Sequence, residues 1–292
     1  MVSNVNTIDE IVTATHTTDG YGNITGVIPP NQVTFANSNN ITPLVLLGNN
    51  FDGNIAKTLL ESSANRQNCI NNLLSIIRNN GYKGVNVDIE GVYYCDRSYY
   101  TAFMSEVYAA LNPLGYTVSA SVPAKTYDST TNSWNGAYDY AAIAKYVDQL
   151  VLMAYDEHYP GGTPGSVASI GWVSSVVNYS VTVVPKEKIY LGVAAYGYDW
   201  SSNGTKAYSI NGCYNLASTY GVTIMWDSVS KSSYFNYTDS TGIAHTVWFE
   251  NAQSLEYKLN LVNSSGIEGI SIWRLGLENT DYWTMIKLKF GI

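Results

Sequence analysis

The chain has 292 residues, of which 46% are hydrophobic and 13% are charged, and it contains no run of about 18 apolar residues that could cross a bilayer. The apolar content excludes a disordered chain, and 23 acidic against 15 basic residues give a net charge of −8, which disfavours nucleic acid as a partner. Tyrosine (25) and tryptophan (7) outnumber phenylalanine (6), and these flat amphipathic rings suit carbohydrate as a ligand.

Seven short apolar runs, separated by turn residues, predict strands that are buried on both faces. They are Glu10–Ala14, Pro43–Gly48, Gly84–Ile89, Thr117–Val122, Gln149–Ala154, Ile189–Ala195 and Gly269–Trp273. Every gap between them can hold a crossover helix. Three gaps carry apolar stripes at helical spacing: Ile70, Leu73, Leu74 and Ile77; Tyr100, Phe103, Val107 and Leu111; and Leu255, Leu259 and Val262. The pattern predicts an α/β fold with parallel strands, a TIM-type (β/α)8 barrel.

The last gap is much longer than the others. It contains two strand-like runs on either side of an Asp-Ser-Thr-Gly turn at residues 239–242, which is typical of a β-hairpin. We therefore expect a small α+β insertion over residues 200–251, within a single catalytic barrel domain that comprises residues 1–292.

Polar and apolar residues alternate strictly in the third predicted strand, GVNVDIE at residues 84–90. Strand geometry places Asn86, Asp88 and Glu90 on one face, which would be the barrel interior. Because two neighbouring carboxylates repel each other, one of the two acids should stay protonated near neutral pH. Cleavage of a glycosidic bond requires such a protonated acid. The alternative is structural, namely that the acids only pair with cations and backbone amides at a strand end.

Residues 82–90 resemble the Asp-x-x-Asp-x-Asp-x-Glu signature of glycoside hydrolase family 18, the chitinases and related N-acetylglucosaminidases. Residues 149–156, 191–200 and 269–273 are similar to later strands of that family, in the same order. The amino-acid sequences of these segments are most similar to a bacterial branch of the family that includes spore-cortex and cell-wall N-acetylglucosaminidases. The resemblance implies a glycosidase that cleaves β-1,4 bonds next to N-acetylglucosamine, in chitin or in peptidoglycan.

The resemblance also implies a substrate-assisted, retaining mechanism. Glu90 would protonate the leaving oxygen while the 2-acetamido carbonyl of the substrate attacks the anomeric carbon. Asp88 would orient the acetamido group, and the Tyr155 hydroxyl would donate to its oxygen. Trp273 would stack beneath the sugar.

Asn86, Asp156 and Tyr196 are further binding candidates in positions where the family lines its pocket. Asp156 could instead cap the loop that follows it. Asn86 replaces an acid of the family signature, and Lys83 replaces the first one, so two of the four signature acids remain. An amide cannot share a proton with Asp88 and can offer only fixed hydrogen bonds. For Trp134 and three other tryptophans, packing is the expected role.

No metal or other cofactor is expected, because the three cysteines and three histidines lack metal-ligand spacing. The expected partner is a polysaccharide that contains N-acetylglucosamine, with no nucleic acid and no membrane span; the oligomeric state stays open. A secreted, cell-wall or spore-associated protein is implied by the resemblance, although the first residues do not form a signal peptide. Two other hypotheses remain: a chitinase-like protein that binds carbohydrate without cleaving it, and a different barrel enzyme that uses two carboxylates.

Only two of the seven predicted strands precede Gly84, whereas the family has three before its catalytic strand. We therefore expect this chain to lack the first strand of the barrel. The consequence would be an open gap between the strands at Glu10–Ala14 and Gly269–Trp273, with unpaired backbone groups at its edges. Such a chain should be less stable than a closed barrel, and the site beside Trp273 could be impaired.

Overall fold

The computed structural model describes residues 2–292. The chain folds into two compact units. Of the described residues, the first unit comprises 2–152 and 180–189, and the second comprises 153–179 and 190–292.

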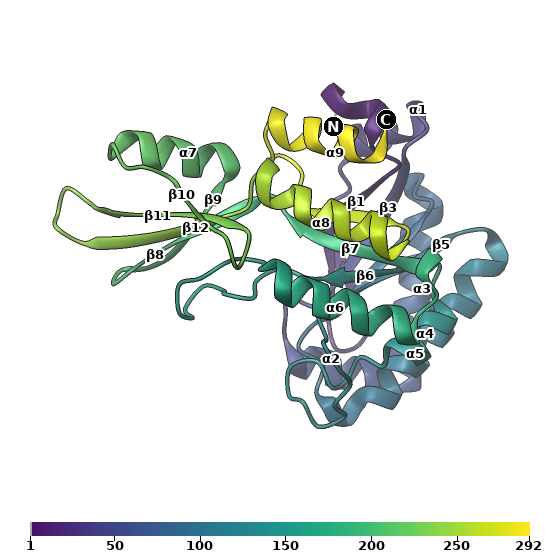
Figure 1. Ribbon diagram of the computed structural model, residues 1–292. Helices are drawn as coiled ribbons and strands as arrows, with labels where there is room; N and C mark the ends of the chain where they lie inside the picture. The colour runs from purple at the N-terminus through teal and green to yellow at the C-terminus, as the bar shows by residue number, and fades with distance from the viewer. Residues whose placement is uncertain (1) are drawn as a thin grey trace. The chain divides into compact units, whose positions relative to one another are not determined.

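The first unit is built on a sheet in the order β2-β1-β3-β4-β5-β6; Figure 1 labels β1, β3, β5 and β6 of these strands. Its strands are β1 (Glu10–Thr18), β2 (Ile24–Gly26), β3 (Thr42–Gly48), β4 (Gly84–Asp88), β5 (Thr117–Pro123) and β6 (Gln149–Met153). The pairs β1–β3, β3–β4 and β4–β5 are parallel, whereas β2 is antiparallel to the end of β1. Because the central strands are parallel, their carboxyl ends meet at one edge of the sheet.

Helices connect these strands. They are α1 (Pro30–Ser38), α2 (Gly53–Glu61), α3 (Ser63–Asn80), α4 (Arg97–Leu111) and α5 (Tyr140–Ile143), with short 3₁₀ turns at Val2–Thr7, Tyr94–Asp96, Asn112–Leu114, Ala144–Tyr146 and Lys186–Lys188. The apolar stripes of α3 and α4 are largely buried, as their spacing predicts.

The second unit combines a parallel pair of strands with an antiparallel sheet (Figure 1). The parallel pair is β7 (Ile189–Ala194) and β13 (Gly269–Trp273). The antiparallel sheet has the order β10-β11-β12-β8-β9, with β8 (Tyr196–Ser201), β9 (Gly204–Ser209), β10 (Met225–Asp227), β11 (Ser232–Thr238) and β12 (Ala244–Phe249). The helices are α7 (Ile210–Thr219), α8 (Ala252–Ser265) and α9 (Thr280–Phe290), together with α6 (Ile170–Val183), whose last residues belong to the first unit.

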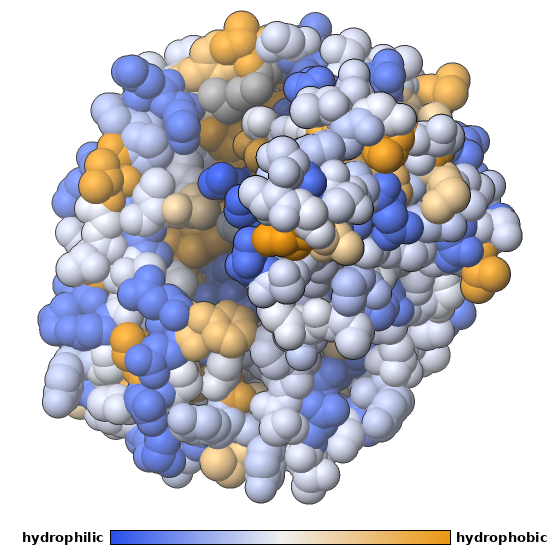
Figure 2. Space-filling model, turned by 90° about the vertical axis from the view of Figure 1, so that its left-hand side faces the viewer, coloured by the Kyte–Doolittle hydropathy of each residue, from blue (hydrophilic) through white to orange (hydrophobic). Residues whose placement is uncertain are grey.

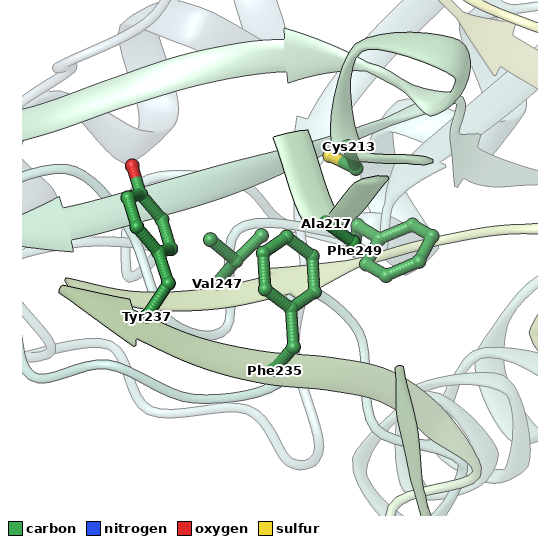
Figure 3. Close-up of a cluster of buried hydrophobic side chains, with 6 residues drawn as sticks. All are labelled: Cys213, Ala217, Phe235, Tyr237, Val247 and Phe249. Carbon is green, nitrogen blue, oxygen red and sulfur yellow. The ribbon is translucent and has the colours of Figure 1, made fainter. Parts of the chain in front are cut away.

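The antiparallel sheet has a hydrophobic core of its own. Helix α7 packs Cys213 and Ala217 against Phe235, Val247 and Phe249 of strands β11 and β12 (Figure 3). The predicted α+β insertion and its hairpin are thus present, but the sheet begins at Tyr196, directly after β7. The interpretation of residues 1–292 as one domain stays a prediction.

All seven predicted parallel strands are present in the described residues: β1, β3, β4, β5, β6, β7 and β13. Two of these strands precede β4, as expected. The seven strands and the helices together form the α/β pattern of a TIM-type barrel. Strand β2 is not among the predicted strands; it pairs with His16, Thr17 and Thr18 of β1. At these three residues the predicted open edge is therefore covered. The predicted gap between β1 and β13 stays a prediction.

None of the helices within residues 2–292 is long and apolar enough to span a membrane. Viewed from the side of the antiparallel sheet, the surface is mostly hydrophilic or neutral, and hydrophobic residues are scattered over it (Figure 2). Scattered apolar residues are ordinary on a protein surface.

A buried ion pair supports the start of β8. Lys258 of α8 donates to Oε2 of Glu250 over 2.7 Å, and both side chains are 1% exposed. The backbone N–H of Glu250 in turn donates to the carbonyl of Tyr196 over 3.0 Å. Loss of either partner would leave a buried charge without compensation.

Lys258→Met is therefore expected to lower the free energy of unfolding by about 3–5 kcal/mol, measured by chemical denaturation. The control is Lys289→Met, which breaks the more exposed Lys289–Glu256 pair and should cost at most about 1 kcal/mol. Equal losses in the two variants would contradict the importance given to the buried pair.

Candidate active site

The polar residues of β4 gather at the carboxyl end of the first unit's sheet. Asn86 and Asp88 lie on the strand, and Glu90 follows it by two residues. The intervening residues Val87 and Ile89 are fully buried. Because successive side chains of a strand point to opposite faces, the polar side chains form a row on one face and the apolar side chains lie on the other.

Asn86 is held by two serines of β5. Its Nδ2 donates to Ser119 Oγ over 3.0 Å, and Ser121 Oγ donates to its Oδ1 over 3.0 Å. Both atoms of the amide are therefore engaged, and the side chain is 1% exposed. Ser119 and Ser121 were missed in the sequence, although they alternate with apolar residues in β5 just as the acids do in β4.

Asp88 carries a strongly perturbed carboxyl group. Burial raises its pKa to about 6, and its Oδ1 is buried without a hydrogen-bond partner among the described residues. The sequence predicts that the proximity of a second carboxylate keeps one of the two acids protonated. Desolvation by burial is the cause of the raised pKa, and an effect of the second carboxylate stays a prediction.

The backbone around Glu90 is fixed from two directions. Its N–H donates to Asn49 Oδ1 over 2.9 Å, and Asn49 Nδ2 donates back to its carbonyl over 2.8 Å. The hydroxyl of Tyr138 donates to the carbonyl of Ile89 over 2.9 Å. Gly91 follows with φ +66°, and a Cβ there would lie 3.2 Å from the carbonyl oxygen of Phe51, so this turn favours glycine.

Two tyrosines lie under this strand end. The rings of Tyr100 and Tyr138 meet edge to face with centroids 5.1 Å apart. Burial raises the pKa of Tyr100, and the charges of Asp88 and Glu90 add to that rise. The Tyr100 hydroxyl has no hydrogen-bond partner among the described residues and stays protonated, so it is a potential donor.

In the second unit, the residues after β6 meet those of β8. Asp156 has a left-handed backbone, with φ +59°, and its Oδ1 accepts hydrogen bonds from Tyr196 (2.6 Å) and Tyr198 (3.0 Å). Burial raises the pKa of Asp156, while the two tyrosine hydrogen bonds oppose the rise. Tyr155 packs edge to face on Tyr196, with ring centroids 6.5 Å apart. The side chain of Asp156 therefore binds tyrosines rather than capping a loop, and Tyr198 is the residue that the sequence did not reveal.

Trp273 ends β13 and is 40% exposed. Its carbonyl accepts a hydrogen bond from the N–H of Ala195 over 2.9 Å, so its backbone is held while its ring remains accessible. For Trp134 the expectation of packing is wrong, because 57% of this residue is exposed. Trp134 contacts only one aromatic ring in the described residues, that of Phe51, at a centroid distance of 5.6 Å.

The predicted site residues thus fall into two sets, each with its own geometry. Asn86, Asp88 and Glu90 are together in the first unit. Tyr155, Asp156, Tyr196 and Trp273 belong to the second unit. Within residues 2–292, no three His, Cys, Asp or Glu side chains are arranged to hold a metal ion, and the first set is suited to acid–base chemistry.

Comparison with known proteins gives a consistent picture. Residues 14–278 match the model of the family described as Glycosyl hydrolases family 18. The chain is 32% identical over 289 residues to the "Uncharacterized glycosylase YvbX" of Bacillus subtilis (strain 168). The alignment covers 96% of this chain and 84% of that relative. It is also 32% identical over 267 residues to the "Cortical fragment-lytic enzyme" of Bacillus anthracis, with 88% of this chain but only 62% of that relative covered.

Two solved structures are similar over nearly the whole chain. The spore cortex-lytic enzyme SleL of Bacillus cereus has a TM-score of 0.91 and 29% identity, covering 98% of this chain and 68% of that one. A chitinase from Chromobacterium violaceum ATCC 12472 has a TM-score of 0.93 and 28% identity, covering 100% and 94%.

The raised pKa of Asp88 predicts how pH affects stability. Because the folded protein retains this proton up to about pH 6, whereas an unfolded Asp loses it near pH 4, the contribution of Asp88 to stability falls as pH rises from about 4 to 6. Asp88→Asn should remove that fall and raise stability at pH 7 by on the order of 1–2 kcal/mol. Thermal unfolding of both proteins from pH 4 to pH 8 checks this, and parallel pH profiles would contradict it.

Proposed function

The chain belongs to glycoside hydrolase family 18 and is a glycosidase, and on that premise we propose that it hydrolyses β-1,4 bonds next to N-acetylglucosamine by substrate-assisted, retaining catalysis. The names of its relatives include cortical fragment-lytic enzymes and a di-N-acetylchitobiase. The proposed substrates are accordingly the glycans of chitin or peptidoglycan. By the same analogy we propose that the protein acts at the spore or the cell wall.

The observation that carries the proposal is the state of Asp88. Its Oδ1 is buried and lacks a partner in the described chain, although buried polar atoms are nearly always hydrogen-bonded. Above about pH 6 this carboxyl is ionised and can accept a hydrogen bond from an acetamido N–H. The positive charge that develops on an oxazolinium ion would then be stabilised by a poorly screened carboxylate.

Glu90 is proposed as the proton donor. It transfers a proton to the glycosidic oxygen as the bond from that oxygen to C1 breaks, while the acetamido carbonyl oxygen forms a bond to C1 on the opposite face. Water then attacks C1, its proton passes to the Glu90 carboxylate, and the oxazolinium ring opens. Two displacements at C1 retain its configuration. The backbone hydrogen bonds from Asn49 hold Glu90 in place for both proton transfers.

Asn86, Tyr155 and Trp273 have supporting roles in this proposal. Asn86 is clamped to two serines, so it gives the site shape and exchanges no proton with Asp88. Tyr155 would donate to the acetamido oxygen, and the accessible ring of Trp273 would stack on the sugar. Asp156 and Tyr196, which are hydrogen-bonded to each other, are proposed to line the pocket.

Glu90→Gln keeps the shape of the side chain but cannot donate the proton, so turnover should fall by about 10²–10⁴-fold with little loss of binding. Release of reducing ends from N-acetylglucosamine oligomers and from peptidoglycan strands measures turnover, and calorimetry measures binding.

Glu61→Gln is the control, since Glu61 lies at the end of α2 and makes an exposed ion pair with Lys57. If Glu90→Gln is as active as the native protein, the assignment of the acid is wrong. If the native protein binds both glycans and cleaves neither, it is a carbohydrate-binding protein of this family.

A second prediction follows from the acetamido nucleophile. An oligomer that carries free amines at C2 lacks the attacking carbonyl, so it should bind but remain uncleaved, with a rate below about 1% of that for the acetylated oligomer. Mass spectrometry of matched acetylated and deacetylated oligomers after incubation gives the answer. Comparable cleavage of the two would refute substrate assistance while leaving a glycosidase.

A further inference from the structure

A small pocket adjoins Trp273 in the second unit. Its volume is about 230 Å³, and it lies between the loop after β13 and strands β8 and β9. Four of its eight lining residues are aromatic, namely Tyr196, Tyr198, Tyr208 and Trp273. Arg274, the residue that follows Trp273, is its only charged lining residue. No carboxylate therefore faces the guanidinium from the pocket wall.

Arg274 makes no ion pair with any residue in the described chain, in contrast to two other arginines. Arg66 is paired with Glu106 over 2.7 Å, and Arg97 with Asp128 over 2.8 Å. The nearest acid in sequence, Glu278, is already occupied, because its Oε2 accepts from the N–H of Gly276 (2.6 Å) and its Oε1 from Trp283 Nε1 (3.1 Å).

The other polar groups of the pocket are largely committed as well. The hydroxyls of Tyr196 and Tyr198 both donate to Asp156, and Ser209 Oγ accepts from the N–H of Gly212 at the start of α7. Arg274 is the one cationic donor among the lining residues, beside the neutral hydroxyls of Tyr208 and Ser209. A guanidinium offers a planar fork of N–H donors that fits a carboxylate. Arg274 is exposed, so a ligand can reach it from solvent.

We infer that this pocket binds a carboxylate carried by the glycan, on a sugar next to the one that stacks on Trp273. The inference rests on the proposed function and makes it more specific. Chitin carries no carboxylate. Peptidoglycan does, on the 3-O-lactyl ether of its N-acetylmuramic acid or on the peptide attached there. The structure therefore favours peptidoglycan over chitin as the substrate.

Calorimetry with the complete chain tests the inference through four tetrasaccharides. The first is the neutral N-acetylglucosamine tetramer. The other three alternate N-acetylglucosamine with N-acetylmuramic acid, and carry free lactyl carboxylates, lactyl methylamides, or intact stem peptides. We expect the free carboxylate to bind at least about tenfold more tightly than its methylamide, and added salt to reduce this preference.

Arg274→Gln should reduce the preference to less than about twofold, and Arg274→Lys, which keeps the charge but loses the fork, should give an intermediate value. Arg78→Gln is the matched control, because it removes the same charge from the exposed face of α3 and should leave the preference intact. A circular dichroism spectrum shows whether each variant is folded.

The outcomes are separable. Equal affinity of the native protein for all four glycans, or a full preference in Arg274→Gln, would overturn the inference. Tightest binding of the stem-peptide glycan, again dependent on Arg274, would support it and assign the carboxylate to the peptide. Cleavage is followed in parallel by mass spectrometry: a charge preference without cleavage of any glycan would overturn the proposed function and leave the pocket assignment standing.

Discussion

The candidate catalytic strand depends on one constraint, that polar groups buried at the end of a parallel strand must find hydrogen-bond partners. Around β4 the partners come from neighbouring strand ends. Ser119 and Ser121 of β5 engage Asn86, and Asn49, which follows β3, engages the backbone of Glu90. Two atoms at this strand end remain without a partner among the described residues, Oδ1 of Asp88 and the hydroxyl of Tyr100. The paired groups are fixed by their hydrogen bonds, whereas Oδ1 of Asp88 and the Tyr100 hydroxyl keep unused hydrogen-bonding capacity.

The same constraint is met differently in the second unit, where aromatic hydroxyls supply the donors. Two tyrosines of β8 donate to Asp156, and Tyr282 of α9, which is fully buried, donates to the carbonyl of Ala194 over 2.9 Å. Tyrosine combines a large apolar ring with one polar tip, so it can fill space and satisfy a buried acceptor at once. This explains the use of tyrosine in place of phenylalanine in a protein with 25 of the former and 6 of the latter.

Charge distribution bears on the choice of substrate. The protein carries a net charge of −8, which would repel a polyanionic glycan at long range. Binding of a carboxylate then requires a local cation whose charge is not neutralised by the protein. Arg66 and Arg97 are neutralised by Glu and Asp partners, whereas Arg274 lies in an aromatic pocket that contains no acid. The positive charge of Arg274 can therefore attract a carboxylate although the net charge of the protein is negative.

The sequence by itself determined the parallel strands, the buried stripes of α3 and α4, and the alternation that puts Asn86 and Asp88 in one polar row, because each depends only on residues near one another in the chain. Only the tertiary structure decided which distant side chains satisfy that row, that burial raises the pKa of Asp88, and that Tyr198 joins Tyr196 on Asp156. It also showed that Trp134 is exposed and that Arg274 has no ion-pair partner in the described chain. Partners, burial and free donors are properties of residues brought together from different strands, and no local pattern specifies them.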